Sequence, residues 1–302
     1  MHDLPFVDRR EGAVVVGDQL AVGAGRPDSG LGLGWGLEGV VGHRSAEYSG
    51  GFENDRECES TRNPRMRITL VRNATVVLEL MGRRILVDPM LDPAGYRPPI
   101  EQTANAVRNP TVELPFAAEE VVAGLDAVLV THCHKDHFDE TAERLLPRDV
   151  PVFCQPEDEE RFRAVGLDVR PVGERVDWDG LAIHRTPARH GFGAVADALA
   201  PVSGFVLDDL YLAGDTVWYE EVENTIKRFA PRVAVVHASA ASFLEGGRIV
   251  MDIDDVREVV ARVPVVVAVH FEAINHCHLS RAELRAAVPS VVVPDDGETI
   301  EA

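Results

Sequence analysis

The sequence contains no unbroken apolar run near the length of about 18 residues that a membrane-spanning helix requires. Its first residues, MHDLPFVDRREG, lack the basic segment and apolar core of a secretory signal peptide. The four cysteines (Cys58, Cys133, Cys154 and Cys277) form no CxxC pair, which argues against a disulfide framework and a cysteine-based zinc knuckle. We therefore expect a cytoplasmic protein with no membrane span.

Positive charge is also in short supply. The chain has 30 Lys and Arg residues against 50 Asp and Glu residues, and its formal net charge is −20. Such a surface repels polyanions, which argues against a nucleic-acid partner and against docking on an anionic membrane. A small-molecule substrate remains the expected partner. The sequence leaves the oligomeric state open, a homo-oligomer included.

The 302 residues divide into two regions of different composition. Residues 1–65 hold 12 of the 25 glycines and show neither helical nor strand periodicity, so we expect a poorly ordered extension there. Residues 66–302 carry regular strand and helix signals and are expected to form one compact domain.

Strand signals come early in this domain and then alternate with helix signals. RITLV, TVVLEL and RRILVDP predict three short strands, and the continuous apolar run DAVLV predicts a strand buried on both faces. Apolar residues at helical spacing predict helices over 218–230 and 254–263. This order favours an α/β sandwich, with two β-sheets packed together and helices outside.

The segment THCHKDHFDE follows the buried strand directly. Residues two apart at a strand end project to the same side, so His132 and His134 can hold one metal ion. Asp136 and His137 can face a second ion in the following turn. Histidine with carboxylate suits Zn²⁺, Mn²⁺ or Fe²⁺. The alternative is a solvated histidine-rich loop, which four ligand-type residues at this spacing disfavour.

Further ligand-type side chains stand at the ends of later strands. His190 closes HRTPARHG, Asp215 follows YLAG as a carboxylate that could bridge two ions, and His270 ends VVVAVH. If these strand ends meet, one edge of the sandwich holds a metal site.

The segments ILVDP, THCHKDHFD, PARHG and AGDT, with the late histidine, closely resemble the signature of the metallo-β-lactamase superfamily. The resemblance covers about residues 66–295 and is nearest to the branch of the L-ascorbate-6-phosphate lactonases and the N-acylphosphatidylethanolamine phospholipase D enzymes. It implies an αββα sandwich of two mixed sheets with the metal site at one edge. It assigns His132, His134 and His190 to a first metal, Asp136, His137 and His270 to a second, Asp215 to both, and Asp88 to orienting a ligand.

The roles of residues in two segments near the motifs stay open. Members of this branch often carry Gly-His where this sequence has Arg72-Asn73, and an asparagine cannot titrate. In NHCH, His276 is a candidate catalytic residue that contacts substrate at the pocket mouth, and His278 is a weaker one.

Other side chains have competing interpretations. His237 either supports the metal ligands or is a satisfied core histidine, and His184 is expected within its strand. We expect Cys133 to point away from its neighbouring ligands and to pack. Trp218 and Tyr219 line a pocket wall or pack a helix.

The expected function is hydrolysis of a small-molecule ester, lactone or phosphoester. Two divalent ions, Zn²⁺ or Mn²⁺ with Fe²⁺ also compatible, would lower the pKa of a shared water toward about 7 and provide hydroxide, which Asp136 helps to hold in line. No G-x-S-x-G motif suggests a serine nucleophile. The alternatives are a di-iron redox protein, whose relatives add a flavin domain not expected here, and a non-catalytic metal-binding protein.

Overall fold

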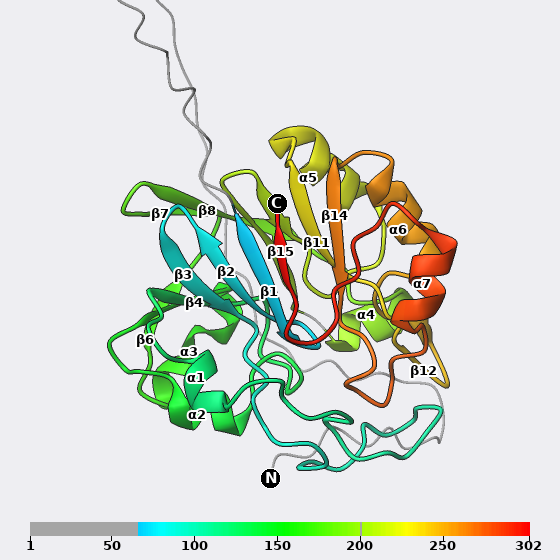
Figure 1. The fold of residues 1–302 in the computed structure, drawn as a ribbon, viewed down its shortest axis with the longest axis horizontal. Coiled ribbons are helices and arrows are strands. Elements are labelled where there is room, and N and C mark those ends of the chain that lie inside the picture. The colour runs from blue at the N-terminus through cyan, green and yellow to red at the C-terminus, as the bar shows by residue number, and fades with distance from the viewer. Residues whose placement is uncertain (1–65, 200) are drawn as a thin grey trace, which may run out of the picture. The chain divides into compact units, whose positions relative to one another are not determined.

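The computed structural model describes residues 66–199 and 201–302. The extension predicted over residues 1–65 lies outside the described residues. Within the described part, two β-sheets pack face to face and helices flank them, as Figure 1 shows. The predicted αββα sandwich is therefore confirmed.

The first sheet has seven strands in the order β15-β1-β2-β3-β4-β5-β6. They are β1 (Arg67–Arg72), β2 (Thr75–Leu80), β3 (Arg83–Val87), β4 (Ala127–Val130), β5 (Pro151–Cys154), β6 (Asp168–Pro171) and β15 (Thr299–Glu301). Pairing is antiparallel from β15 to β3 and parallel from β3 to β6. The sheet is thus mixed, as expected.

The second sheet has six strands in the order β14-β11-β10-β9-β8-β7. They are β7 (Arg175–Trp178), β8 (Leu181–Pro187), β9 (Ser203–Leu207), β10 (Leu210–Leu212), β11 (Val233–His237) and β14 (Val265–Val269). The pairs β10–β11 and β11–β14 are parallel and the others antiparallel. A two-stranded ribbon, β12 (Ser242–Phe243) and β13 (Gly247–Arg248), stands apart.

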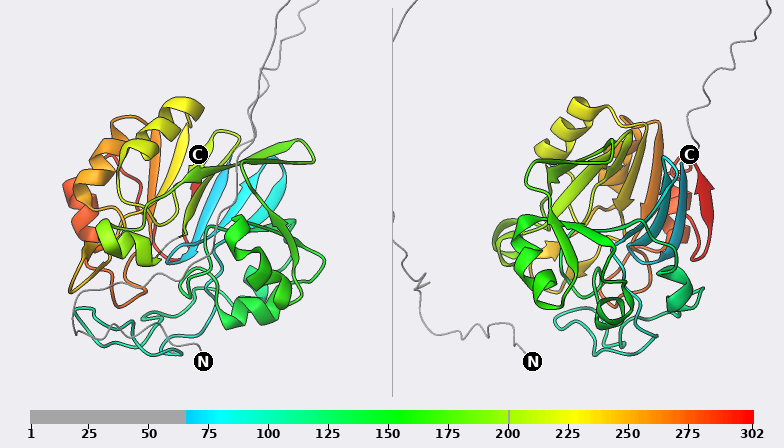
Figure 2. Two further views of the ribbon diagram at one scale, coloured as in Figure 1. Left: turned by 180° about the vertical axis from the view of Figure 1, so that it is seen from behind. Right: turned by 90° about the vertical axis from the view of Figure 1, so that its left-hand side faces the viewer.

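Buried apolar side chains form three main layers. Alternate residues of both sheets, such as Leu70, Leu129 and Phe205, meet between the sheets. The outer face of the first sheet packs on α1 to α3, and that of the second packs on α5 to α7, an arrangement also visible in Figure 2. The helices are α1 (Ala118–Val121), α2 (Glu140–Leu145), α3 (Glu159–Ala164), α4 (Gly193–Leu199), α5 (Glu220–Phe229), α6 (Ile253–Val260) and α7 (Arg281–Ala287), with a 3₁₀ turn at Pro156–Asp158. In the described ranges, no helix combines the length and hydropathy needed to cross a membrane.

Strand register brings the predicted site residues to one edge. Val87 of β3 pairs with Leu129 of β4, so Asp88 lies next to the start of the histidine motif. In the second sheet, His237 of β11 pairs with Val269 of β14. Because β3, β4, β10, β11 and β14 all end at the same edge, segments far apart in sequence contribute side chains there.

Candidate metal centre

His132, His134 and His190 form the first group of potential ligands. Nε2 of His132 and Nδ1 of His134 are 2.9 Å apart, and one ring nitrogen of each of the three residues lies within 4.8 Å of the others. Nδ1 of His190 donates to the carbonyl oxygen of Ile249 at 2.8 Å, which leaves Nε2 without a proton and available to a cation.

Asp136, His137 and His270 form a second group beside the first. Oδ2 of Asp136 is 3.7 Å from Nε2 of His137 and 3.4 Å from Nε2 of His270. Both histidines are fully buried, and neither Nε2 atom has a hydrogen-bond partner. Buried polar atoms are normally satisfied, so this donor set fits a metal cation that would complete their coordination.

Asp215 lies between the two groups. Its Oδ2 is 3.9 Å from Nε2 of His132, 3.3 Å from Nε2 of His137 and 3.4 Å from Nε2 of His190, and its Oδ1 is 3.7 Å from Nε2 of His270. A carboxylate with one oxygen near histidines of both groups has the geometry to contact two ions.

Gly214 fixes the backbone that presents Asp215. Its φ is +67°, and a Cβ atom at this position would lie 2.5 Å from the carbonyl oxygen of Ser203. Only glycine meets both requirements at this position. Three other residues at the site, Asn73, Asp88 and His270, also hold positive φ, which is uncommon outside glycine and concentrates at functional sites.

Asp88 contacts two residues of the histidine motif. Its carboxylate accepts hydrogen bonds from the backbone N and the Oγ1 of Thr131, at 2.7 and 2.8 Å, and lies 2.9 Å from Nδ1 of His137. His137 therefore points Nε2 toward the centre. That Asp88 orients a metal ligand, as the resemblance implies, stays a prediction.

Burial and neighbouring charges give the histidines of the centre different pKa values. Burial lowers the pKa of His190 to about 4, so its ring is neutral. Burial also disfavours the charged form of His137, but attraction to Asp215, Asp136 and Asp88 outweighs burial and raises its pKa to about 10. Burial opposes ionisation of Asp215 as well, yet His137 and other neighbouring histidines hold its pKa well below the usual range. The proton on His137 balances the negative charge of the neighbouring carboxylates. A bound cation would take over this role.

Asn73 and His276 also reach the centre, whereas His278 does not. Nδ2 of Asn73 donates to the carbonyl oxygen of Asp136 at 3.0 Å, and the carbonyl of Asn73 accepts from the backbone N of His270 at 2.8 Å. Asn73 thus links two segments that carry candidate ligands, and these hydrogen bonds do not require it to titrate. Nε2 of His276 lies 3.8 Å from Oδ2 of Asp136, while His278 is exposed.

The structure gives the contacts of the other side chains that have competing interpretations. Nδ1 of His237 is 2.6 Å from Oδ1 of Asp215, so His237 supports a potential ligand. His184 lies within β8 and its ring faces Phe229. The packing role of Cys133 is confirmed, because it packs on the outer core of the first sheet. Trp218 and Tyr219 pack on the core beneath α5 and α6.

Sequence reasoning missed Asn275, which anchors a long loop to the site. Its amide donates to Ile100, Thr103 and Asn105, and its Oδ1 accepts from the backbone N of Ile100 and from Nδ2 of Asn109. The partners lie 166 to 175 residues away in sequence, so no local pattern marks this hub. The loop is thereby held next to His276.

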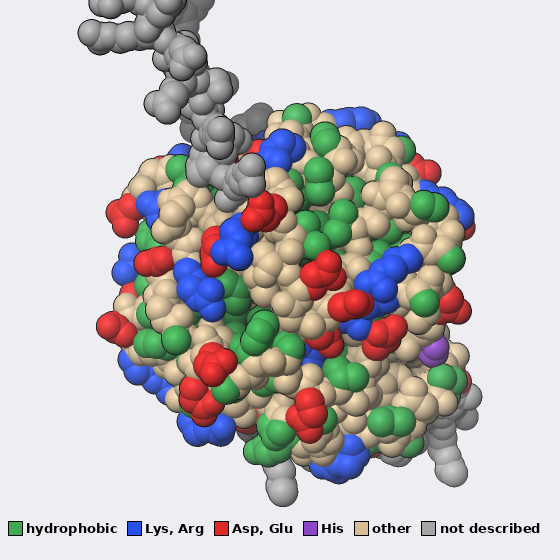
Figure 3. All heavy atoms as spheres, in the orientation of Figure 1, with side chains coloured by type: hydrophobic (Ala, Val, Ile, Leu, Met, Phe, Trp, Pro, Cys, Tyr) green, Lys and Arg blue, Asp and Glu red, His purple; other side chains and the backbone are tan. Residues whose placement is uncertain are grey.

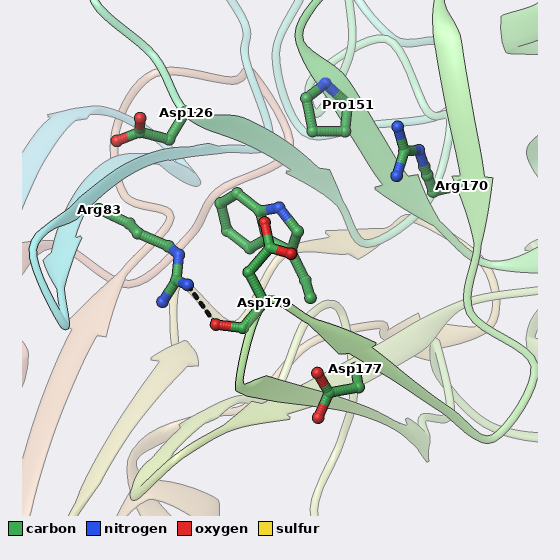
Figure 4. A pocket seen from close by; sticks show the side chains of 7 residues that line it. Arg83, Asp126, Pro151, Arg170, Asp177 and Asp179 are labelled. Carbon is green, nitrogen blue, oxygen red and sulfur yellow. Dashed lines mark hydrogen bonds between the residues drawn. The ribbon is translucent and has the colours of Figure 1, made fainter.

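A surface hollow of about 440 Å³ lies away from the histidines. Figure 4 shows that Arg83 donates to the backbone oxygen of Asp179 there, at 2.6 Å, with Asp126 and Pro151 nearby. Asp126 and Pro151 stand at the starts of β4 and β5, whereas the histidine motif follows the end of β4. The hollow therefore belongs to the opposite edge of the sheet.

Comparisons with known proteins identify the family of the chain. Residues 83–271 match the family described as the β-lactamase superfamily domain. The UPF0173 protein YddR of Bacillus subtilis (strain 168) is 35% identical over 251 residues, covering 78% of this chain and 99% of that protein.

Two solved structures are similar over their whole length. One is the isothiocyanate hydrolase from Delia radicum gut bacteria, with a TM-score of 0.74 and 35% identity over 78% of this chain and 100% of that one. The other is a possible metal-dependent hydrolase from Veillonella parvula DSM 2008, with a TM-score of 0.75 and 34% identity over 79% of this chain and 100% of that one. The chain therefore belongs to the metallo-β-lactamase superfamily and is a metal-dependent hydrolase of its UPF0173 group.

Proposed function

We propose that the chain is a dinuclear hydrolase. His132, His134 and His190 would hold one ion, Asp136, His137 and His270 the other, and Asp215 would contact both. The observation that carries the proposal is the position of Asp215 Oδ2, 3.3 Å from Nε2 of His137 in one group and 3.4 Å from Nε2 of His190 in the other. Nitrogen and oxygen donors without a thiolate suit Zn²⁺ or Mn²⁺, and also Fe²⁺.

Two divalent ions bound there would supply a water of lowered pKa and would stabilise negative charge developing on the substrate. We assign to Asp136 the role of holding this water in line; its Oδ2 lies 3.4 Å from Nε2 of His270 and 3.8 Å from Nε2 of His276. The pKa of His276 is lowered to about 4 by burial, so its ring is neutral and able to donate or accept one hydrogen bond to substrate.

The substrate we propose is a small ester, lactone or phosphoester, as in the lactonase-like branch that the motifs resemble. The face drawn in Figure 3 carries acidic and basic side chains interspersed, rather than the continuous basic stripe that a nucleic acid requires. The described cysteines are free thiols, which supports a cytoplasmic location.

An isothiocyanate is a second candidate substrate. The observation that favours it is the 35% identity, over the whole of that chain, to the structure described as an isothiocyanate hydrolase. The chemistry is related, since water would add to the electrophilic carbon of N=C=S, and the resulting thiocarbamate would release an amine and carbonyl sulfide.

A parallel assay tests these proposals. Protein loaded with Zn²⁺ or Mn²⁺ is given a γ-lactone, bis(p-nitrophenyl) phosphate and an aryl isothiocyanate, beside the isosteric Asp215→Asn variant. Turnover of the lactone or the phosphodiester that Asp215→Asn lowers by about 100-fold or more supports the first proposal. Turnover of the isothiocyanate alone favours the second candidate, and equal rates in both proteins would refute a role for Asp215.

A further inference from the structure

A third group of metal-capable side chains lies next to the proposed dinuclear centre. One donor atom of each of His270, His276 and Cys277 lies within 4.8 Å of the others. The two nitrogens of His270 face different neighbours. Nε2 is 3.4 Å from Oδ2 of Asp136, whereas Nδ1 is 3.8 Å from Sγ of Cys277 and 3.3 Å from Oγ of Ser239. One side of the ring thus faces the dinuclear centre and the other faces the third group.

His276 supplies independent evidence for a missing partner. The residue is only 4% exposed, and neither ring nitrogen has a hydrogen-bond partner. Leaving a buried polar group unsatisfied costs about 1–3 kcal/mol. The residue is nevertheless held in place. Its ring stacks on His270 with centroids 6.0 Å apart, and the backbone carbonyl oxygen of His276 accepts from the backbone N of Ser242 at 3.1 Å. A ligand would satisfy this imidazole.

Cys277 determines which ligand this group would prefer. Cys277 is half-buried, whereas His270 and His276 are buried. An ion can therefore enter from solvent beside Cys277, and the thiol proton can leave by the same way. A thiolate with two imidazoles is a soft donor set, which selects thiophilic ions over Mg²⁺ or Mn²⁺. The proposed dinuclear centre contains only nitrogen and oxygen donors, so the two places differ in metal preference.

We propose that His270, His276 and Cys277 form a third metal site, which takes a thiophilic divalent ion such as Cd²⁺ or surplus Zn²⁺ and inhibits hydrolysis when it is filled. Binding exchanges the Cys277 S–H bond for a sulfur–metal bond. Where Nε2 of His270 already holds an ion of the dinuclear centre, Nδ1 exchanges its N–H bond for a nitrogen–metal bond, and both protons are released to solvent. Inhibition follows because the ion occupies His276, the residue that the proposed function places against substrate.

The test follows thiolate coordination directly by absorption. Cys58 lies outside the described residues, so Cys58→Ser serves as the background. Cd²⁺ is titrated into this protein after it has been loaded with Zn²⁺, and the ultraviolet thiolate-to-cadmium charge-transfer band is recorded. We expect the band to saturate at about one equivalent beyond the Zn²⁺ content. It should disappear in Cys277→Ser and persist in Cys133→Ser, because Cys133 packs on the outer core of the first sheet.

A second variant separates a three-ligand site from a lone thiolate. His276→Gln should weaken Cd²⁺ binding by about tenfold or more while the band remains at high Cd²⁺. An unchanged affinity in His276→Gln would overturn the site, as would a band that survives Cys277→Ser. Two equivalents of Zn²⁺ with no thiolate band would refute this site and leave the dinuclear proposal standing. A thiolate band in a protein that does not hold two equivalents of Zn²⁺ would support this site and refute the dinuclear proposal.

Discussion

At the scale of single residues, Asp88 is the side chain that we expect to orient a metal ligand. Its carboxylate is fully buried and contacts Thr131 and Nδ1 of His137. Partners of this kind fix the tautomer and the direction of a ligating histidine, and their loss costs about 10–100-fold in metal affinity. The Asn73 amide acts on the same motif by a different route, through the backbone oxygen of Asp136.

Replacing Asp88 with Asn should therefore weaken metal binding by about 10–100-fold, because an amide cannot accept from Thr131 and His137 as a carboxylate does. Competition with a chromogenic chelator measures the change. Asp126→Asn is a matched control, since Asp126 accepts a backbone N–H at the opposite edge of the same sheet. Equal affinities in the two variants would rule out the orienting role of Asp88.

The pKa values of the candidate ligands predict proton release on metal binding. His137, whose pKa is raised to about 10, holds a proton at about pH 8 that an incoming ion must displace. His190, whose pKa is about 4, is already neutral and releases none. We expect at least about one proton to be released at pH 8, and fewer as the pH rises past about 10. Calorimetry in two buffers of different ionisation enthalpy measures this number, and identical heats in both would contradict it.

At the scale of elements, strand ends and the turns that follow them position the site. The turn after β10 requires Gly214, which has φ +67° and no room for a Cβ atom against Ser203. The turn after β14 places His270 at φ +71°. For a residue other than glycine such a conformation costs about 1–3 kcal/mol, and at His270 it persists because the surrounding structure holds it.

Gly214→Ala should lower the free energy of unfolding by more than the conformational penalty alone and should reduce metal content. The matched control is Gly124→Ala, whose φ is a similar +64° but whose Cβ would meet nothing within 4 Å. Denaturant unfolding of the control should show a loss of about 1–2 kcal/mol. If both variants lost the same stability and kept the same metal content, the close approach of Ser203 would not matter.

The sequence predicted those elements whose signals are local. The buried strand β4, the amphipathic helices α5 and α6 and the histidine motif all follow from periodicity or spacing. It did not predict β15, a three-residue strand that pairs with β1 across more than 200 residues of sequence. The role of His237 stayed open for a similar reason, since its contact with Asp215 depends on the pairing of β10 with β11. Both features depend on pairing between strands that are far apart in sequence. The residue pattern of β15 alone does not reveal its pairing with β1.

At the scale of the whole molecule, the centre joins the two sheets. His132 and His137 follow β4 of the first sheet, whereas Asp215 and His270 follow β10 and β14 of the second. A bound ion would therefore link the two sheets, in addition to its proposed role in hydrolysis. Ligands that bind only the folded state stabilise it in proportion to the logarithm of their concentration over Kd.

Removing metal should lower the melting temperature. At a free metal concentration about 100 times Kd, binding adds about 2.7 kcal/mol, which corresponds to roughly 5–10 °C for a domain of this size. Differential scanning calorimetry with and without a chelator measures the shift. In His134→Ala the shift should shrink, and a full shift in that variant would place the stabilising ion elsewhere.

Metal stoichiometry tests the dinuclear proposal most directly. Mass spectrometry of the purified protein, prepared without chelators, gives the metal content of the wild type beside Asp215→Asn and His134→Ala. We predict about two equivalents of Zn or Mn in the wild type and a lower content in both variants. A fully active wild type that holds only one equivalent, or no metal, would contradict the dinuclear centre.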